Sequence, residues 1–161
     1  MSNELTAYYH SPIGWLEIKA NTYFVFSIWF VEEQKQNSDS HPLLSSANTQ
    51  LKQYFTSERK IFDFPMQQKG TDFQNRVWNQ LLTIPFGKTL SYQQLSKNIG
   101  DVKAIRAVGT TNGKNQLGIV VPCHRVIGTD GSLTGYAGGL WRKKWLLEHE
   151  QNSVSQQQKL F

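Results

Sequence analysis

The sequence predicts an α+β protein with two small domains and a C-terminal tail. Residues 5–31 are rich in aromatic and β-branched residues interrupted by turn formers, which is typical of strands. In the second half, apolar residues recur at three- and four-residue steps, which indicates amphipathic helices. A polar stretch ending in glycine, residues 66–70, separates the two halves. We therefore expect an N-terminal α/β domain over residues 1–68, a mainly helical C-terminal domain over 69–152 and a flexible tail over 153–161.

The N-terminal half is expected to form a small sheet and one helix. Pro12, Gly14 and the polar stretch 20–22 divide the apolar run into strands that would pair as a hairpin or meander. Apolar residues at helical spacing predict an amphipathic helix over residues 43–55, and residues 60–65 favour a short strand. These elements make up the α/β part of the predicted fold.

The C-terminal half begins with a predicted helix over residues 73–82. A Ser-x-x-Gln capping box at Ser91 then opens a short helix that ends near Gly100. A second short helix, over residues 102–108, follows a tight turn. Two short helices joined by a glycine-containing turn form a helix-turn-helix pattern, although many helical pairs of this kind bind nothing.

The remainder of this half predicts a wing and a last helix. Residues 128–131 favour a turn, and residues 132–136 are expected to return as a strand. The whole would then be similar to a winged helix-turn-helix. Apolar residues and their polar neighbours over 141–149 predict a final amphipathic helix.

Positive charge is concentrated in the second half of the 161-residue chain, whose formal net charge is +5. Residues 1–70 hold six Lys and Arg against seven Asp and Glu, whereas residues 71–150 hold ten against five. A basic half joined to a neutral half suggests a polyanionic partner such as nucleic acid, with a merely solvated basic surface as the alternative.

The sequence also favours one compartment over others. It has no basic-plus-apolar signal pattern at its start and no apolar run of about 18 residues, so we expect neither secretion nor a membrane span. One free cysteine suits a reducing cytosol. We therefore expect a cytoplasmic protein.

One stretch, Ile119–Ile127, holds the only cysteine of the chain, Cys123. A single thiol cannot form an intramolecular disulfide, so it serves either packing or reactivity, and an isolated Cys is by default a buried apolar residue. Pro122 favours a strand end, where a side chain can be presented. His124 and Arg125 are cationic or near-cationic groups of the kind that lower a thiol pKa. These neighbours favour a reactive cysteine.

Six blocks of the second half stand in one order at consistent separations. They are Ser91–Leu95, Arg106–Gly109, Asn115, Pro122–Ile127, Gly135–Gly139 and Trp145–Glu150. Together they resemble the O6-alkylguanine-DNA alkyltransferases, also called methylated-DNA–protein-cysteine methyltransferases. The first half matches this family only in general character. The resemblance implies a ribonuclease H-like N-terminal α/β domain and a winged helix-turn-helix-like C-terminal domain that binds DNA and accepts the alkyl group.

The resemblance implies direct repair of double-stranded DNA by a monomeric, single-turnover enzyme without a cofactor. An O6-alkylguanine, with O4-alkylthymine as a further candidate substrate, would be flipped from the duplex and attacked at its alkyl carbon by Cys123. The thioether is never hydrolysed, so each molecule would react once. His124 would act as the base, polarised by Glu150. Because neighbouring side chains of a strand point to opposite faces, the resemblance implies a non-extended turn at Cys123 and a relay through water.

The resemblance also implies which residues hold the DNA and the flipped base. Tyr92 would donate to the leaving guanine and steer the 3′ phosphate, Arg106 would fill the gap left by the base, and Asn115 would hold the turn before the cysteine. The second helix of the helix-turn-helix would lie in the minor groove, where small residues permit close approach. Further DNA contacts are expected at Gln93 and Thr129, and pocket contacts at Val126, Tyr136, Ala137 and Gly138.

Two features depart from some members of the family. Some bind zinc in the first domain through cysteines and histidines, but this chain has one cysteine and four histidines, so no metal site is expected. Ala137 and Gly138 are small where some members carry bulkier groups. They predict a pocket that accepts alkyl groups larger than methyl.

Three other functions stay open on the sequence. A lesion-sensing relative flips alkylguanine without transfer, but such proteins replace the cysteine, usually by tryptophan. A winged-helix transcription regulator would explain the charge distribution, but it leaves Pro122–Arg125 and Glu150 without a role. A Cys-His hydrolase would turn over repeatedly on esters or amides, whereas an alkyltransferase reacts once.

Overall fold

The chain forms two compact units, and a computed structural model of it describes residues 4–159. The N-terminal unit consists of the chain up to Gln68 together with Gln116–Val120, and the C-terminal unit consists of Lys69–Asn115 and the chain from Val121 onward. The first unit is a small sheet with one helix and the second is mainly helical, so the predicted α+β class is confirmed. None of the helices within the described residues is long and apolar enough to span a membrane.

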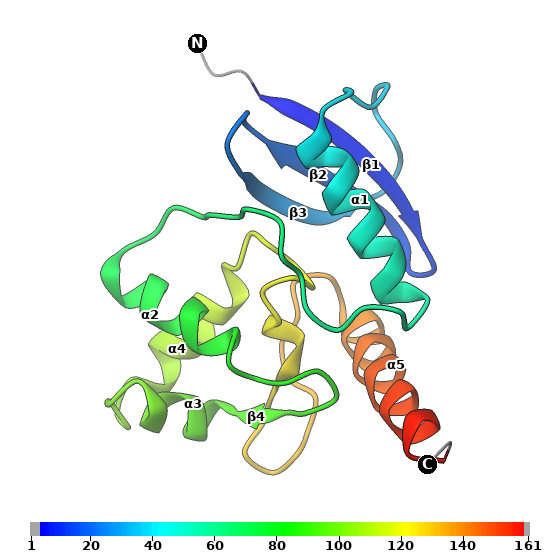
Figure 1. Cartoon of the computed structure of the whole chain (residues 1–161). Helices are drawn as coiled ribbons and strands as arrows, with labels where there is room; N and C mark the ends of the chain where they lie inside the picture. Colours follow the sequence, from blue (N-terminus) through cyan, green and yellow to red (C-terminus); the bar gives the residue numbers. More distant parts are fainter. Residues whose placement is uncertain (1–3, 160–161) are drawn as a thin grey trace. The chain divides into compact units, whose positions relative to one another are not determined.

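An antiparallel meander of three strands forms the centre of the N-terminal unit (Figure 1). The strands are β1 (Leu5–Ser11), β2 (Gly14–Ala20) and β3 (Val25–Val31). Helix α1 (Pro42–Phe55) packs against the sheet through an apolar face on which Leu51 and Tyr54 are fully buried. Proline at the first helical position and an imidazole cap, in which His41 Nδ1 accepts from Leu43 N–H at 3.1 Å, explain where this helix begins.

Loop segments cover both edges of this sheet. Along β1, Thr6 N–H donates to Asp39 Oδ2 at 2.8 Å and Thr6 carbonyl accepts from Asp39 N–H at 2.8 Å. Along β3, Val25 pairs in parallel with Met66, and Ile28 pairs in parallel with Leu117. Unpaired edges invite association with other chains, so these pairings protect the sheet.

Residues 116–118, which precede the cysteine stretch, are therefore fastened to the N-terminal sheet. Ile28 N–H donates to Gln116 carbonyl at 2.9 Å and Gly118 N–H donates to Ile28 carbonyl at 2.9 Å. A Cβ at Gly118 would lie 2.6 Å from the Trp29 ring, so only glycine permits this approach.

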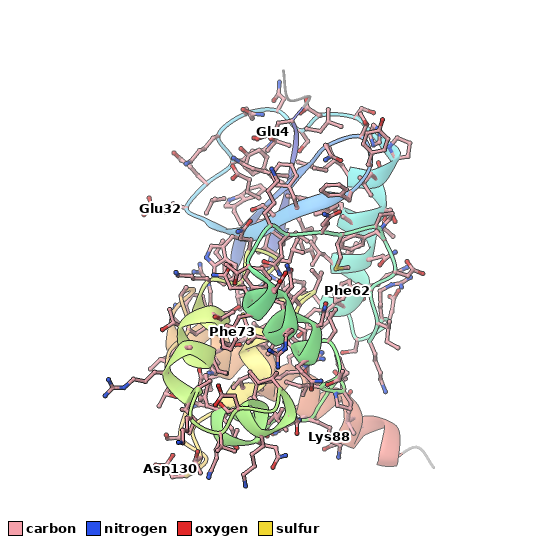
Figure 2. The ribbon with its side chains drawn as sticks, turned by 90° about the vertical axis from the view of Figure 1, so that its left-hand side faces the viewer. Glu4, Glu32, Phe62, Phe73, Lys88 and Asp130 are labelled. Carbon is pink, nitrogen blue, oxygen red and sulfur yellow. The ribbon has the colours of Figure 1, made fainter. Side chains whose placement is uncertain are left out.

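The predicted strand over residues 60–65 is wrong. These residues form no strand, and only the single bridge at Met66 reaches the sheet. Aromatic packing accounts for their apolar character instead. The ring of Phe62, labelled in Figure 2, packs on Tyr54 of α1 at a centroid distance of 5.7 Å, and Phe64 is buried.

The C-terminal unit is built on α2 (Asp72–Leu81), α3 (Tyr92–Asn98) and α4 (Ile105–Gly113). Its core includes Val77, Leu81, Leu95 and Val108, all fully buried. Helix α2 is tied to α4 by the indole of Trp78, which donates to Thr111 carbonyl at 3.1 Å. The predicted pair of short helices before the cysteine is present as α3 and α4.

The caps of these helices differ from the sequence prediction. Ser91 accepts from Gln94 N–H at 3.0 Å, but the Gln94 side chain donates to Asn98, so only half of the predicted capping box forms. A complete box closes the start of α2, between Thr71 and Gln74.

Helix α4 begins three residues later than predicted and runs to Gly113. The carboxylate of Asp101 accepts from Lys103 N–H at 3.0 Å and the Asp101 carbonyl accepts from Ala104 N–H at 3.1 Å. Residues 101–104 therefore form a turn, and the hydrogen bonds of helix α4 begin only after it.

The predicted wing strand over residues 132–136 is also wrong. The short strand β4 (Leu90–Ser91) pairs in parallel with β5 (Val126–Ile127), and no further strand follows within the described residues. A turn at residues 128–132, which includes Asp130 in Figure 2, closes through Gly128 N–H to Ser132 carbonyl at 2.8 Å. Gly135 then adopts a φ of 57°, which interrupts an extended path.

The last helix, α5 (Leu140–Lys159), extends ten residues beyond the predicted end at residue 149. Ser153, in the stretch expected to be a flexible tail, is buried and donates from its hydroxyl to His149 carbonyl at 2.8 Å. Residues 160–161 of the predicted tail lie outside the described residues.

Candidate active site

Cys123 opens a short 3₁₀ helix, η1 (Cys123–Arg125), and is 2% exposed. Pro122 has φ −83° and ψ 65°, and Cys123 N–H donates to Val121 carbonyl at 2.8 Å, which is an inverse γ-turn. The backbone is therefore not extended at Cys123, in agreement with the turn that the resemblance implies. This geometry removes the objection that Cys123 and His124 would face opposite sides of a strand.

Two asparagine side chains hold the turn from the preceding helix and loop. Asn115 Nδ2 donates to Val121 carbonyl at 2.8 Å, and Asn112 Nδ2, from α4, donates to Cys123 carbonyl at 3.3 Å. Both asparagines are buried. Asn115 was expected at this turn, whereas sequence reasoning missed Asn112.

His124 is fully buried and paired with Glu150 of α5. Its Nε2 lies 2.6 Å from Glu150 Oε2, and burial lowers the pKa of His124 while Glu150 raises it. An ionised carboxylate can only accept, so Nε2 carries the proton of the neutral ring. Nδ1 has no hydrogen-bond partner among the described residues, which leaves its lone pair available as a base.

Glu150 is the most heavily bonded carboxylate of the site. It accepts from Gly87 N–H at 3.1 Å, from Arg125 Nε at 2.8 Å and from a terminal Arg125 nitrogen at 3.2 Å, in addition to His124. Burial opposes its ionisation, but His124 and Arg125 outweigh burial and hold the pKa of Glu150 well below its usual range. Arg125 also donates to Ile84 carbonyl at 2.6 Å, so its guanidinium is locked in place.

The thiol is not activated in the way the sequence suggested. Burial raises the pKa of Cys123 to about 11, against lowering by Asn115 and by Lys143. Arg125 is engaged by Glu150, and the pKa of His124 is lowered, so neither serves as the neighbouring cation. In the free protein Cys123 is therefore a protonated, shielded thiol at neutral pH.

The other predicted residues are candidates for lining the alkyl pocket or for contacting DNA. Tyr92, at the start of α3, and Tyr136 both interact electrostatically with Cys123, and Tyr92 donates to Thr134 carbonyl at 3.3 Å. The remaining pocket candidates are Val126 and Gly138, which are buried, and Ala137, which is exposed. The remaining DNA candidates, all exposed, are Arg106 on α4, Gln93 on α3 and Thr129 in the turn after β5.

Sequence reasoning missed the partners of this cluster. Arg125 stands in the cysteine block, but its pairing with Glu150 could not be read from the residues. Lys143 of α5 is fully buried beside the site. The available signal was its helical spacing of three, four and seven residues from Leu146, Leu147 and Glu150, which places it on the buried face. No group of three or more potential metal ligands occurs within residues 4–159.

Comparison with known proteins supplies the family. A family model described as the ribonuclease-like domain of 6-O-methylguanine DNA methyltransferase matches residues 5–68, and one described as the DNA binding domain of the same protein matches residues 72–152. The chain belongs to the 6-O-methylguanine DNA methyltransferase family. This agrees with the resemblance drawn from the cysteine-bearing blocks.

Several methylated-DNA–protein-cysteine methyltransferases are similar along most of their length. The Mycobacterium tuberculosis protein is 44% identical over 156 residues, covering 94% of this chain and 94% of the relative. The Methanosarcina acetivorans protein is 41% identical over 150 residues, covering 89% of this chain and 96% of the relative. Among solved structures of the family, Mycobacterium tuberculosis OGT in complex with DNA matches with a TM-score of 0.83 and 43% identity, covering 93% of each chain.

Proposed function

We propose that this protein repairs alkylated DNA by moving the alkyl group of O6-alkylguanine onto Cys123, once per molecule. The observation that carries the proposal is the cluster in which the only cysteine sits in a tight turn beside a neutral histidine paired with a buried glutamate. Family membership and the similarity to a structure of a relative in complex with DNA support the substrate class.

The nucleophile is made when the substrate arrives. The thiol proton of Cys123 passes through a water molecule to Nδ1 of His124, and the carboxylate of Glu150 stabilises the imidazolium through Nε2–H. The sulfur then forms a bond to the alkyl carbon while the bond from that carbon to O6 breaks. A thiolate suits this displacement because it is the strongest soft nucleophile among side chains.

The leaving guanine takes up negative charge that must be neutralised. The hydroxyl of Tyr92, which donates to Thr134 carbonyl in the free protein, would turn its proton toward the guanine ring. The proton held by His124 can return to the guanine, so no charge remains at the end of the reaction. The product is neutral guanine and a thioether at Cys123, which no group in the cluster is placed to hydrolyse.

DNA would be bound by residues 69–152 as a separate domain, with α4 in the minor groove and a monomer on each lesion. Flipping the damaged base costs a few kcal/mol, and Arg106 would offset part of that cost by filling the gap. Gln93 and Thr129 would contact the backbone. The pocket would be lined by Val126, Tyr136, Ala137 and Gly138. We also propose a cytoplasmic location, in which the protein has access to DNA.

Intact-mass spectrometry after mixing the protein with a duplex containing one O6-methylguanine tests the proposal. We expect a gain of one methyl, localised to Cys123 and saturating at one per molecule. Parallel duplexes with O6-benzylguanine and O4-methylthymine measure the breadth of the pocket, and absence of benzyl transfer would contradict the roomy pocket.

Cys123→Ala serves as the control, since it removes the acceptor and should bind the duplex without any mass change. An unchanged mass of the wild-type protein with tight lesion binding would replace the proposal by a lesion sensor. No change and no lesion preference would favour a winged-helix regulator.

A further inference from the structure

Asn112 carries a buried polar atom that the proposed reaction does not use. The residue lies in the last turn of α4 and is 3% exposed. Its Nδ2 donates to Cys123 carbonyl at 3.3 Å, whereas its Oδ1 is buried and has no hydrogen-bond partner among the described residues. A backbone carbonyl can only accept, so the amide nitrogen must face Cys123 and Oδ1 must point away from it.

A buried acceptor without a donor is unusual in a folded protein. Leaving an amide oxygen in this state destabilises the fold, and native structures satisfy the large majority of such atoms. The backbone beside Asn112 is held firmly, because Thr111 carbonyl accepts from the Trp78 indole at 3.1 Å. Oδ1 is therefore presented at a fixed place, as a group that binds a ligand must be.

The neighbours of Asn112 are residues that the proposed reaction assigns to the damaged base. Gly109 lies three residues earlier on the same face of α4, and a Cβ there would meet the Tyr92 ring at 3.9 Å. Asn112 thus lies between Tyr92 and the Cys123 turn. Burial raises the pKa of Tyr92 and the Asn112 side chain lowers it, which agrees with this placement. A guanine held by Tyr92 and attacked by Cys123 would meet the Asn112 amide.

The chemistry of the lesion limits which donor can satisfy this oxygen. Alkylation at O6 leaves N1 of the guanine ring without a proton, and N9 is bonded to the sugar. The exocyclic amine at C2 is then the only N–H donor of the base. O4-alkylthymine has no N–H donor at all, because its N3 has lost the proton in the same way.

We propose that Asn112 is a specificity-determining residue, whose Oδ1 accepts a hydrogen bond from the 2-amino group of the flipped O6-alkylguanine. This rests on the proposed function, since it names the base that the pocket selects. A base without the amine leaves Oδ1 buried and unpaired, so O4-alkylthymine is a disfavoured substrate. At the same time Nδ2 holds the turn at Cys123.

The test changes the base and the side chain together. The wild type and Asn112→Leu, which has a similar size and no polar atoms, each receive three duplexes of one sequence. Their lesions are O6-methylguanine, O6-methylhypoxanthine, which lacks only the 2-amino group, and O4-methylthymine. Intact mass gives the transfer rates, and fluorescence anisotropy gives affinities in a Cys123→Ala background, where no transfer occurs. Asn79→Leu, at an exposed asparagine of α2, is the matched control.

We expect the wild type to react about tenfold faster or more with O6-methylguanine than with O6-methylhypoxanthine, because the second base leaves a buried acceptor unsatisfied. In Asn112→Leu this ratio should fall below about threefold, since the side chain no longer couples to the amine. Loss of the Nδ2 bond to Cys123 lowers all three rates together, so the ratio reports Oδ1 alone. The affinities should follow the same pattern, and Asn79→Leu should keep the wild-type ratio.

Equal wild-type rates and affinities for the two purine lesions would overturn the proposal, and so would an unchanged ratio in Asn112→Leu. If Asn112→Leu does not fold, Asn112→Ser replaces it in the same comparison, because the shorter side chain does not reach the base. A preference in affinity for the amine that disappears in Asn112→Leu, without methyl transfer by the wild type, would instead refute the proposed function and leave base recognition by Asn112 standing.

Discussion

Glu150 connects the base to the backbone of the site. Its two oxygens accept from His124, from Arg125 and from Gly87 N–H, and the side chain is almost completely buried. It therefore fixes the imidazole tautomer and neutralises a buried guanidinium with the same charge. Replacing Glu150 should therefore change the stability of the protein and the reactivity of its active site together.

Glu150→Gln should lower both the stability of the folded protein and the rate of alkyl transfer. The variant leaves the Arg125 charge without a counter-ion, and breaking a buried pair in this way costs about 3–5 kcal/mol. The transfer rate should also fall, because a neutral amide supports the imidazolium poorly. Urea unfolding and single-turnover rates measure the two effects, with the exposed Glu148→Gln as the matched control. Equal stability of both variants would contradict the buried pairing.

Glu150 should also make the stability of the folded protein fall at acid pH. The pKa of Glu150 is lower in the folded protein than its ordinary value of 4.5, so the folded state is stabilised above that pH. This contribution is lost progressively as the pH falls below about 4.5. Unfolding free energies measured from pH 3 to 7 should therefore fall more steeply toward acid for the wild type than for Glu150→Gln. Parallel curves would contradict this.

For individual residues, the sequence identified which side chains belong to the active site better than it identified their hydrogen-bond and ion-pair partners. His124, Glu150 and Asn115 were taken from the family resemblance, and the fold brings all three to the Cys123 turn. The partners of Arg125 and Lys143 depend on tertiary packing between segments far apart in the chain. For that reason the sequence suggested Arg125 as the neighbour of the thiol, whereas it is the neighbour of Glu150.

Helix α4 combines a packing face with an exposed face, and its two glycines differ in what surrounds them. A Cβ at Gly109 would meet only Tyr92 atoms at 3.9 Å and 4.0 Å, and one at Gly113 would meet nothing within 4 Å. Neither glycine is required by the fold. If α4 lies in the minor groove, Gly109 would serve the DNA instead.

Gly109→Ala should separate stability from binding. Alanine in a helix interior is favoured over glycine by about 0.5–1 kcal/mol, so thermal unfolding should shift upward. Affinity for lesion-containing duplex should fall, since the added methyl group stands between α4 and the groove. Gly113→Ala is the control and should leave affinity unchanged. Unaltered affinity of Gly109→Ala for the duplex would contradict the proposal that this part of α4 lies in the minor groove.

Elements with sustained periodicity were predicted well, whereas three short segments were not. The meander and helices α1 and α2 match their predicted ranges within one or two residues. The errors at residues 102–104 and 132–136 arise where local polar groups or glycines decide the backbone path, whereas residues 60–65 owe their apolar character to aromatic packing on α1. An aspartate turn delays α4, and positive φ at Gly135 replaces a strand.

The whole chain carries its positive charge on one half. Residues 71–150 hold twice as many basic as acidic residues, and the DNA-binding family model covers the same stretch. Such a distribution favours binding through phosphates, with little dependence on base sequence.

Binding to undamaged duplex should therefore weaken steeply with salt. A log–log plot of affinity against salt should have a slope near −0.9 for each phosphate neutralised. Lys103→Gln, in the exposed turn before α4, should reduce the slope by about one, whereas the exposed Lys35→Gln in the N-terminal unit should leave it unchanged. Both slopes are measured by fluorescence titration. Equal slopes for the two variants would show that Lys103 makes no more contact with DNA phosphates than Lys35 does.

The burial of Cys123 has a consequence for the life of the molecule before it meets damage. A protein that reacts once is wasted if its thiol is consumed by peroxide or by a stray electrophile. Because the side chain is 2% exposed and its pKa is about 11, such reagents encounter neither an accessible sulfur nor an appreciable thiolate fraction. Burial of the thiol therefore preserves the acceptor residue in each copy of the protein before it reacts with damaged DNA.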